Sequence, residues 1–189
     1  DGGVTTNKGE NKNYNVIFTG SCLGQGDRKD WLDIINKEVP VTVFSWNYEE
    51  WRKRGFTAYH AVYGEEYNRV IAQSKVVLGF SVNPNCWGYW SNRVGKVLRA
   101  GGCLVYQYAP GMELLLGNSV DYFSSPGEAI EKCKFYVENK EERDMQTDRA
   151  KAVGRQFTSE YRVKQLVILI ERFLKKGDAT WHLSKILMT

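Results

Sequence analysis

The sequence has few of the residues from which self-contained catalytic sites and metal sites are built. Its 189 residues include only two histidines, His60 and His182, and four cysteines without a Cys-x-x-Cys pair. A lone histidine in a strand or tail is usually structural. No group of His, Cys or Asp has metal-ligand spacing, and neither Gly-x-Ser-x-Gly nor Gly-x-Gly-x-x-Gly occurs. We therefore predict no metal and no cofactor, and find only weak support for a nicotinamide nucleotide.

Long hydrophobic runs are also missing. A membrane-spanning helix needs roughly twenty apolar residues, and the strongest candidate, residues 166–170, is flanked by charged side chains. The cysteines are widely separated, and Cys103 and Cys133 stand in apolar patterns typical of small core residues. We therefore expect a cytoplasmic protein without a transmembrane segment. Because the chain begins at Asp1 and shows no signal peptide, we expect its natural N-terminus to lie upstream.

No strong excess of one charge sign is present. The chain has 26 Lys and Arg residues against 22 Asp and Glu residues, scattered along its length, for a net charge of +4. This balance is typical of a solvated surface, so nucleic acid is not an expected partner. The length and the 42% apolar content suit one domain with a full core.

What the sequence does have is an alternation of short apolar runs and helical patterns. Strands are predicted at residues 14–19, 41–45, 57–62, 76–80, 103–107 and 120–123, with helices between them and three more helices afterwards. This pattern predicts an α/β fold: a Rossmann-like, doubly wound parallel sheet of about six strands with helices on both faces. The commonest strand order is 3-2-1-4-5-6. Residues 1–13 are predicted to be a linker, residues 14–177 the domain, and residues 178–189 an apolar tail.

Three of the expected helices carry further local signals. Asp27 is predicted to cap the helix after the first strand, which has Ile34 on its buried side. Ser125 and Glu128 are predicted to form a capping box at the start of a helix after the sixth strand, and the next helix is predicted at residues 141–157.

The stretch from residue 74 to residue 105 organises the prediction. An apolar strand leads into a long loop containing Pro84, and Ser91 can then cap a helix. The first amides of that helix belong to Asn92, Arg93 and Val94, and a helix N-terminus carrying an arginine is a favourable seat for a phosphate. The alternative is a crossover whose loop is merely long.

A second loop, residues 20–26, follows the first strand and contains three glycines. Glycines permit close approach by a ligand, although the same loop can be read as a tight turn into a helix. In the predicted strand order the first and fourth strands are neighbours, and ligands bind beyond their carboxyl ends. The loops at residues 20–26 and 81–90 therefore point to one crevice, where we predict a phosphate-bearing ligand.

Several short motifs in order carry a family resemblance over residues 14–174. They are Phe18 to Ser21 with Arg28, Tyr63 to Tyr67, Ser74 to Ser81, Asn92 and Arg93 with Gly101 and Gly102, Tyr108 to Glu113, and Ser125 to Ala129. In these the sequence resembles the C-terminal, donor-binding half of a GT-B glycosyltransferase, most of all the group-1 type of CgeB-like spore-coat proteins. The resemblance implies one half of a GT-B fold.

The resemblance also implies a function. Such a domain binds a nucleoside-diphosphate sugar in a cleft whose other wall is an N-terminal acceptor domain, here missing, so the isolated domain is expected to be inactive. The transferase would be of the hexosyltransferase type. The implied donor-binding residues are Gly20, Ser21, Arg28, Tyr63, Gly64, Ser81, Asn92, Arg93, Val94, Gly95, Lys96 and Glu113.

Two positions differ from the family pattern. Lys96 stands where the family commonly has a Glu that binds the ribose hydroxyls, and Gly88 stands where many relatives have an acidic residue. One alternative is therefore a degenerate domain that keeps the fold and serves as an interaction module. A more distant alternative is a different nucleotide-binding α/β protein.

Overall fold

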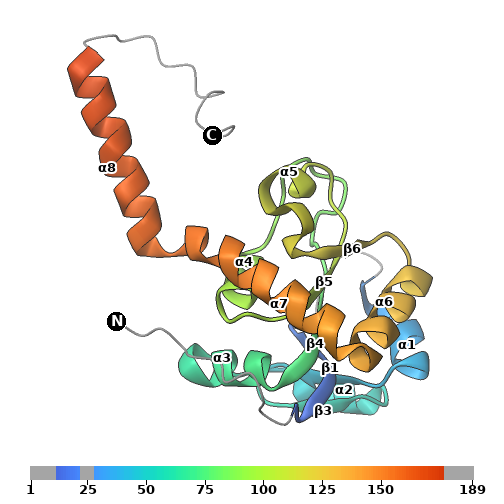
Figure 1. Cartoon of the computed structure of the whole chain (residues 1–189). Helices are drawn as coiled ribbons and strands as arrows, with labels where there is room; N and C mark the ends of the chain where they lie inside the picture. Colours follow the sequence, from blue (N-terminus) through green and yellow to red (C-terminus); the bar gives the residue numbers. More distant parts are fainter. Residues whose placement is uncertain (1–11, 22–27, 177–189) are drawn as a thin grey trace.

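The computed structural model describes residues 12–21 and 28–176, with a single six-stranded sheet in which all paired strands are parallel (Figure 1). The strand order is β3-β2-β1-β4-β5-β6. The strands are β1 (Tyr14–Thr19), β2 (Val41–Phe44), β3 (Thr57–Tyr59), β4 (Ser74–Gly79), β5 (Leu104–Gln107) and β6 (Asp121–Phe123). In the register of the sheet, Phe18 lies opposite Val43 on one side and Leu78 on the other. The predicted fold class and strand order are confirmed.

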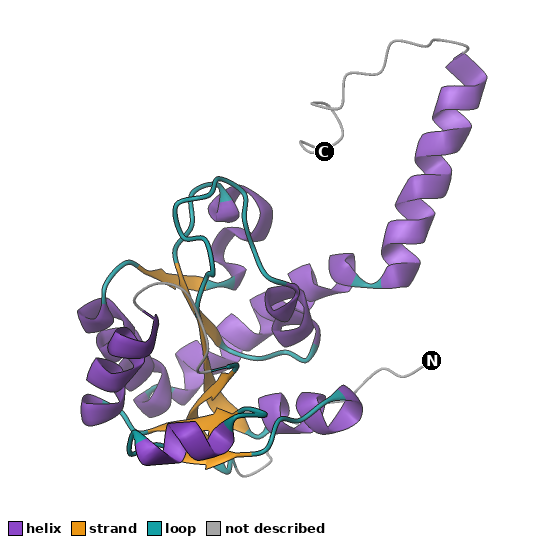
Figure 2. Ribbon diagram, turned by 180° about the vertical axis from the view of Figure 1, so that it is seen from behind, coloured by secondary structure: helices purple, strands orange, loops and turns teal. Residues whose placement is uncertain are grey.

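Helices cover both faces of this sheet (Figure 2). They are α1 (Arg28–Glu38), α2 (Tyr48–Lys53), α3 (Gly64–Ala72), α4 (Asn92–Arg99), α5 (Met112–Leu116), α6 (Pro126–Glu138), α7 (Lys140–Gly154) and α8 (Ser159–Lys176), with short 3₁₀ turns η1 (Gly117–Ser119) and η2 (Arg155–Phe157).

Alternation along each strand divides the interior into two cores. Val16 and Phe18 point to one face, where α1, α2 and α6 pack, whereas Ile17 points to the other, where α3, α4 and α7 pack. This follows from the two-residue period of a strand, which makes both faces of a central parallel strand apolar. Helices α3 and α4 therefore pack on the same face of the sheet.

Close contact between α7 and α4 fixes the position of α4. A Cβ added at Gly154 would lie 2.6 Å from the carbonyl carbon and oxygen of Leu98, so the two helices meet without a side chain between them. One turn earlier on α4, a Cβ on Gly95 would lie 3.3 Å from Phe157 Cβ. Both glycines are buried, and each permits an approach that a larger residue would prevent.

Side-chain hydrogen bonds cap the start of α6. The predicted capping box is present: Ser125 Oγ accepts a hydrogen bond from the Glu128 amide at 3.2 Å. The reciprocal bond differs from the standard one, since the Glu128 carboxylate accepts from the amide of Ser124 at 2.9 Å.

Several predicted boundaries were wrong. The third strand ends at Tyr59 rather than residue 62, and the helix predicted at residues 141–157 ends at Gly154 before a 3₁₀ turn. Ile34, assigned to the buried side of the first helix, is 46% exposed. The helix cap predicted at Asp27 and most of the loop at residues 20–26 lie outside the described residues.

The last helix, α8, extends away from the sheet (Figure 1). Apolar side chains along it are exposed, among them Val163, Leu166, Ile170 and Phe173. No helix among the described residues combines the length and hydrophobicity needed to cross a membrane. The predicted linker, except for residues 12 and 13, and the predicted tail fall outside the described part of the chain, so the domain boundaries stay predictions.

Candidate functional site

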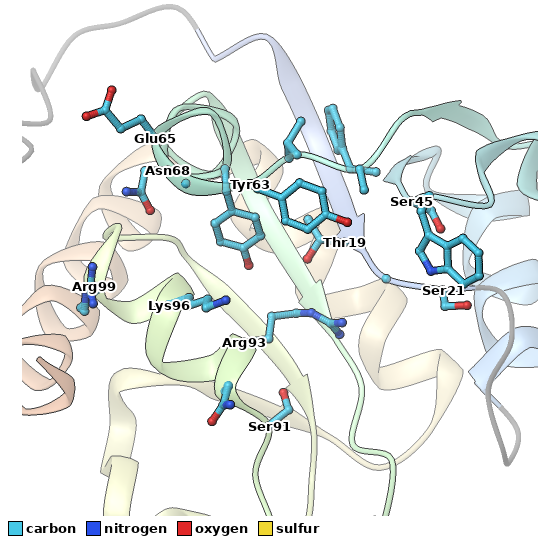
Figure 3. Close-up of a pocket in the computed structure, with 18 residues that line it drawn as sticks. Thr19, Ser21, Ser45, Tyr63, Glu65, Asn68, Ser91, Arg93, Lys96 and Arg99 are labelled. Atoms are coloured by element: carbon cyan, nitrogen blue, oxygen red, sulfur yellow. The ribbon is translucent and has the colours of Figure 1, made fainter. Parts of the chain in front are cut away.

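A cavity of about 800 Å³ opens at the carboxyl ends of β1 and β2 and between α3 and α4 (Figure 3). Four parts of the chain form it: the end of β1, the end of β2 with the residues after it, the segment that leads from β3 into α3 together with α3 itself, and one face of α4. The lining residues are Thr19, Gly20, Ser21, Phe44, Ser45, Trp46, Ala61, Val62, Tyr63, Gly64, Glu65, Tyr67, Asn68, Ser91, Asn92, Arg93, Lys96 and Arg99.

At the end of β1, the backbone of Gly20 lies close to the guanidinium of Arg93. The Gly20 amide donates to the Phe44 carbonyl oxygen at 3.1 Å, so it is already used in the structure. A Cβ on Gly20 would lie 2.6 Å from Phe18 Cζ and 3.2 Å from Arg93 Nη2. The contribution of Gly20 is therefore space, because a glycine lets the Arg93 guanidinium lie beside the strand end.

The first turn of α4 is open toward the cavity. Ser91 occupies the N-cap position as predicted, but its side chain makes no capping hydrogen bond. The Val94 amide donates to the Ser91 carbonyl oxygen at 3.0 Å. The amides of Asn92 and Arg93 have no carbonyl of an earlier turn to bond. This turn carries no acidic residue, so its partial positive charge is uncompensated by its own side chains.

Three cations on one face of α4 line the cavity. Arg93, Lys96 and Arg99 are spaced by three residues, which places them along one side of the helix. Within the described residues none of the three makes an ion pair, although Arg93 lies over the Phe18 ring at 5.7 Å. Glu65 is the one carboxylate among the residues that line the cavity. The cavity is therefore electropositive and suited to an anion.

Two hydroxyl groups face each other beside Arg93. Burial raises the pKa of Tyr67, while the Thr19 hydroxyl and the charge of Arg93 oppose that rise. Thr19 is only 6% exposed, and neither hydroxyl oxygen makes a hydrogen bond of standard geometry within the described residues. Buried hydroxyls in this state have hydrogen-bonding capacity for a bound molecule.

The structure brings together many of the predicted site residues. Those that line the cavity are Gly20, Ser21, Tyr63, Gly64, Asn92, Arg93 and Lys96. They come from three separate parts of the chain: the end of β1, the start of α3 and the exposed face of α4. Their part in donor binding stays a prediction.

Other predicted site residues lie outside this cavity. Val94 and Gly95 are buried on the core side of α4, and Ser81 is buried just after β4. Glu113 is exposed on α5, where it accepts a hydrogen bond from the Tyr108 hydroxyl at 3.3 Å. Arg28 is the first residue of α1, and its guanidinium carbon lies 5.9 Å from the centre of the Phe18 ring.

The loop at residues 81–90, predicted to border the same crevice as residues 20–26, does not line the cavity. Its tryptophans pack elsewhere: Trp90 lies 4.7 Å from the Phe157 ring centre, and Trp87 lies against Gly111. The wall is formed instead by the segments after β2 and β3. Sequence reasoning missed Ser45 and Trp46, although they follow the carboxyl end of β2, to which the same rule applies. Asn68, on α3, was missed as well. It also missed Arg99, which the three-residue spacing from Lys96 could have indicated.

The described part of the chain contains no group of three or more His, Cys, Asp or Glu side chains placed to hold a metal ion.

Comparison with known families gives the class of this protein. The profile of the family described as "Glycosyl transferase-like" matches residues 28–168, most of the chain. The chain belongs to this family. Among curated proteins no sequence matches significantly.

Solved structures with a similar fold include those of three other proteins. An α1,3-fucosyltransferase with GDP-fucose has 19% identity and a TM-score of 0.54, over 70% of this chain and 37% of that one. Sucrose-phosphate synthase from Thermosynechococcus elongatus has 7% identity and a TM-score of 0.60, over 88% and 47%. Anabaena HepE in complex with UDP and glucose has 17% identity and a TM-score of 0.57, over 85% and 48%. This chain thus spans less than half the length of each. The fold is that of one Rossmann-like half of a GT-B glycosyltransferase.

Proposed function

We propose that this chain is the donor-binding domain of a glycosyltransferase and binds a nucleoside-diphosphate sugar in the cavity between α3 and α4. The observation that carries the proposal is the convergence in one cavity of the β1 end, the open first turn of α4 and three cations that make no ion pair within the described residues. A diphosphate is the part of such a donor that this arrangement suits.

Two of the similar structures support the choice of ligand. By their titles, one holds GDP-fucose and the other UDP and glucose. Since this chain spans less than half of each, a second domain in the full protein would hold the acceptor. We propose that the present domain is the C-terminal half and that the transferase is of the hexosyltransferase, CgeB-like type.

The cavity suggests how the donor is oriented. The diphosphate lies at the amides of Asn92 and Arg93 and against the Arg93 guanidinium. The nucleoside then extends along α4 past Lys96, with its base bordered by Tyr63 and Gly64. In this position Arg93 and the helix amides stabilise the charge that develops on the leaving diphosphate, without a metal.

Isothermal titration calorimetry with UDP, GDP and their sugars tests the proposal. We expect one of these nucleotides to bind, and Arg93→Ala to weaken binding by about 1.5–3 kcal/mol, the range for a hydrogen bond to a charged group. Arg69→Ala, on the exposed surface of α3 outside the cavity, is the matched control and should bind as the wild type does.

A folded domain that binds none of these nucleotides would overturn the proposal and favour the interaction-module alternative. Unchanged affinity in Arg93→Ala would show that the nucleotide does not bind at the first turn of α4. The isolated 189-residue chain should transfer no sugar, and turnover by it would show that no second domain is needed.

A further inference from the structure

The row of cations on α4 is longer than a diphosphate at its first turn requires. Arg93 and Arg99 are six residues apart, about 9 Å along the helix axis. Figure 3 shows Lys96 between them, with Arg99 and Asn68 at the end of the cavity remote from Ser21. Arg93 alone reaches the end of β1, so Lys96 and Arg99 face a different part of any bound nucleotide.

Helix electrostatics accounts for part of this pattern. A cation in the last turn of a helix is stabilised by about 0.3–1 kcal/mol whatever it faces, and Arg99 is in the last turn of α4. That effect does not explain why both cations line a cavity, nor why neither makes an ion pair among the described residues. Across the cavity α3 offers the amide of Asn68 and the single carboxylate of Glu65.

The chemistry of Lys96 and Arg99 indicates which anion would lie beside them. Ribose hydroxyls are commonly held by a carboxylate, which accepts their hydrogen bonds, whereas a cation accommodates a phosphate on the ribose. If the diphosphate lies at Arg93, the ribose lies over Lys96, and its 2′ and 3′ positions are directed along α4 toward Arg99.

We propose that the preferred nucleotide carries a phosphate on its ribose, at the 2′ or 3′ position, bound by Lys96 and Arg99. This inference rests on the proposed nucleotide site and names the substrate class more closely. The ligand would be a nucleotide phosphorylated at both the 5′ and the 2′ or 3′ position.

Calorimetry with matched pairs of nucleotides tests it. GDP is compared with guanosine 5′-diphosphate 3′-diphosphate, and AMP with adenosine 2′,5′-bisphosphate and adenosine 3′,5′-bisphosphate. We expect the ribose-phosphorylated member to bind at least about tenfold more tightly, equal to about 1.4 kcal/mol. The two adenosine bisphosphates distinguish the 2′ from the 3′ position.

Two variants locate the effect. Arg99→Gln and Lys96→Gln should each remove most of the preference, measured as the ratio of the two affinities within each pair of nucleotides. Arg69→Gln on α3, exposed and outside the cavity, should keep the full preference.

Equal affinity within each pair, with binding still dependent on Arg93, overturns this inference and leaves the nucleotide site intact. A preference that persists in both Arg99→Gln and Lys96→Gln also overturns it. Failure of every nucleotide to bind overturns the inference and the proposed function together.

Discussion

Replacing Gly20 with alanine should both lower the stability of the domain and displace Arg93 in the candidate site. The added Cβ would lie 2.6 Å from Phe18 Cζ and 3.2 Å from Arg93 Nη2. Phe18 has no exposed surface and is held edge to face by Trp51 and Phe80, each with its ring centre 5.9 Å away. Because the ring cannot turn aside, the methyl group overpacks the core.

Overpacking of this kind costs about 1–3 kcal/mol of unfolding free energy. For a domain of this length, each kcal/mol lowers the melting temperature by about 2–4 °C. Chemical denaturation followed by circular dichroism measures the first quantity, and calorimetry with the nucleotide that binds measures the displacement of Arg93 as a loss of affinity.

Gly127→Ala is the matched control. It stands in the first turn of α6, where an added Cβ would meet nothing closer than Ser125 Oγ at 3.9 Å. This substitution should leave stability unchanged or raise it by up to about 1 kcal/mol. If Gly20→Ala unfolds at the same denaturant concentration as the wild type and keeps its nucleotide affinity, the close packing of Gly20, Phe18 and Arg93 is refuted.

Three other substitutions or conditions give measurable results in denaturation experiments. Gly154→Ala places a Cβ 2.6 Å from the Leu98 carbonyl and should cost about 1–3 kcal/mol or more while weakening nucleotide binding, because α4 must move; wild-type stability would contradict the helix contact. Ser125→Ala removes the side-chain cap of α6 and should cost about 0.5–2 kcal/mol, whereas no loss would mean the cap is energetically silent. Burial raises the pKa of the Cys133 thiol from 9.0 to about 12, so between pH 9 and pH 12 the unfolded chain loses this proton while the folded chain keeps it. The free energy of unfolding should therefore fall over this range by about 1.4 kcal/mol per pH unit, and less steeply in Cys133→Ala. Equal slopes in the wild type and the variant would contradict the raised pKa.

Much of the fold could be predicted because its signals are local. Apolar runs such as residues 14–19 and the capping box at Ser125 depend on neighbours a few positions away, and both were correct. The observed strand order is the commonest one for a doubly wound sheet, which is how it was predicted. The failures were at ends, such as the third strand, where tertiary contacts decide the last residues.

The site was less predictable because its walls come from separate parts of the chain. The cap signal at Ser91 indicated a helix that starts with Asn92 and Arg93, and both residues line the cavity. The loop at residues 81–90 looked equally suitable, but its Trp87 and Trp90 pack against Gly111 and Phe157 instead. No local pattern shows which partner an aromatic side chain will find.

The most direct test of the central claim is an amide ¹H–¹⁵N titration of the domain with UDP and GDP. If a diphosphate lies at the first turn of α4, the amide signals of Asn92 and Arg93 should show the largest shifts, and Arg93→Ala should reduce them. The signals of residues 113–116 on α5, outside the cavity, should stay in place. Largest shifts at α5, or no shift at Asn92 and Arg93 on saturation, would contradict the account.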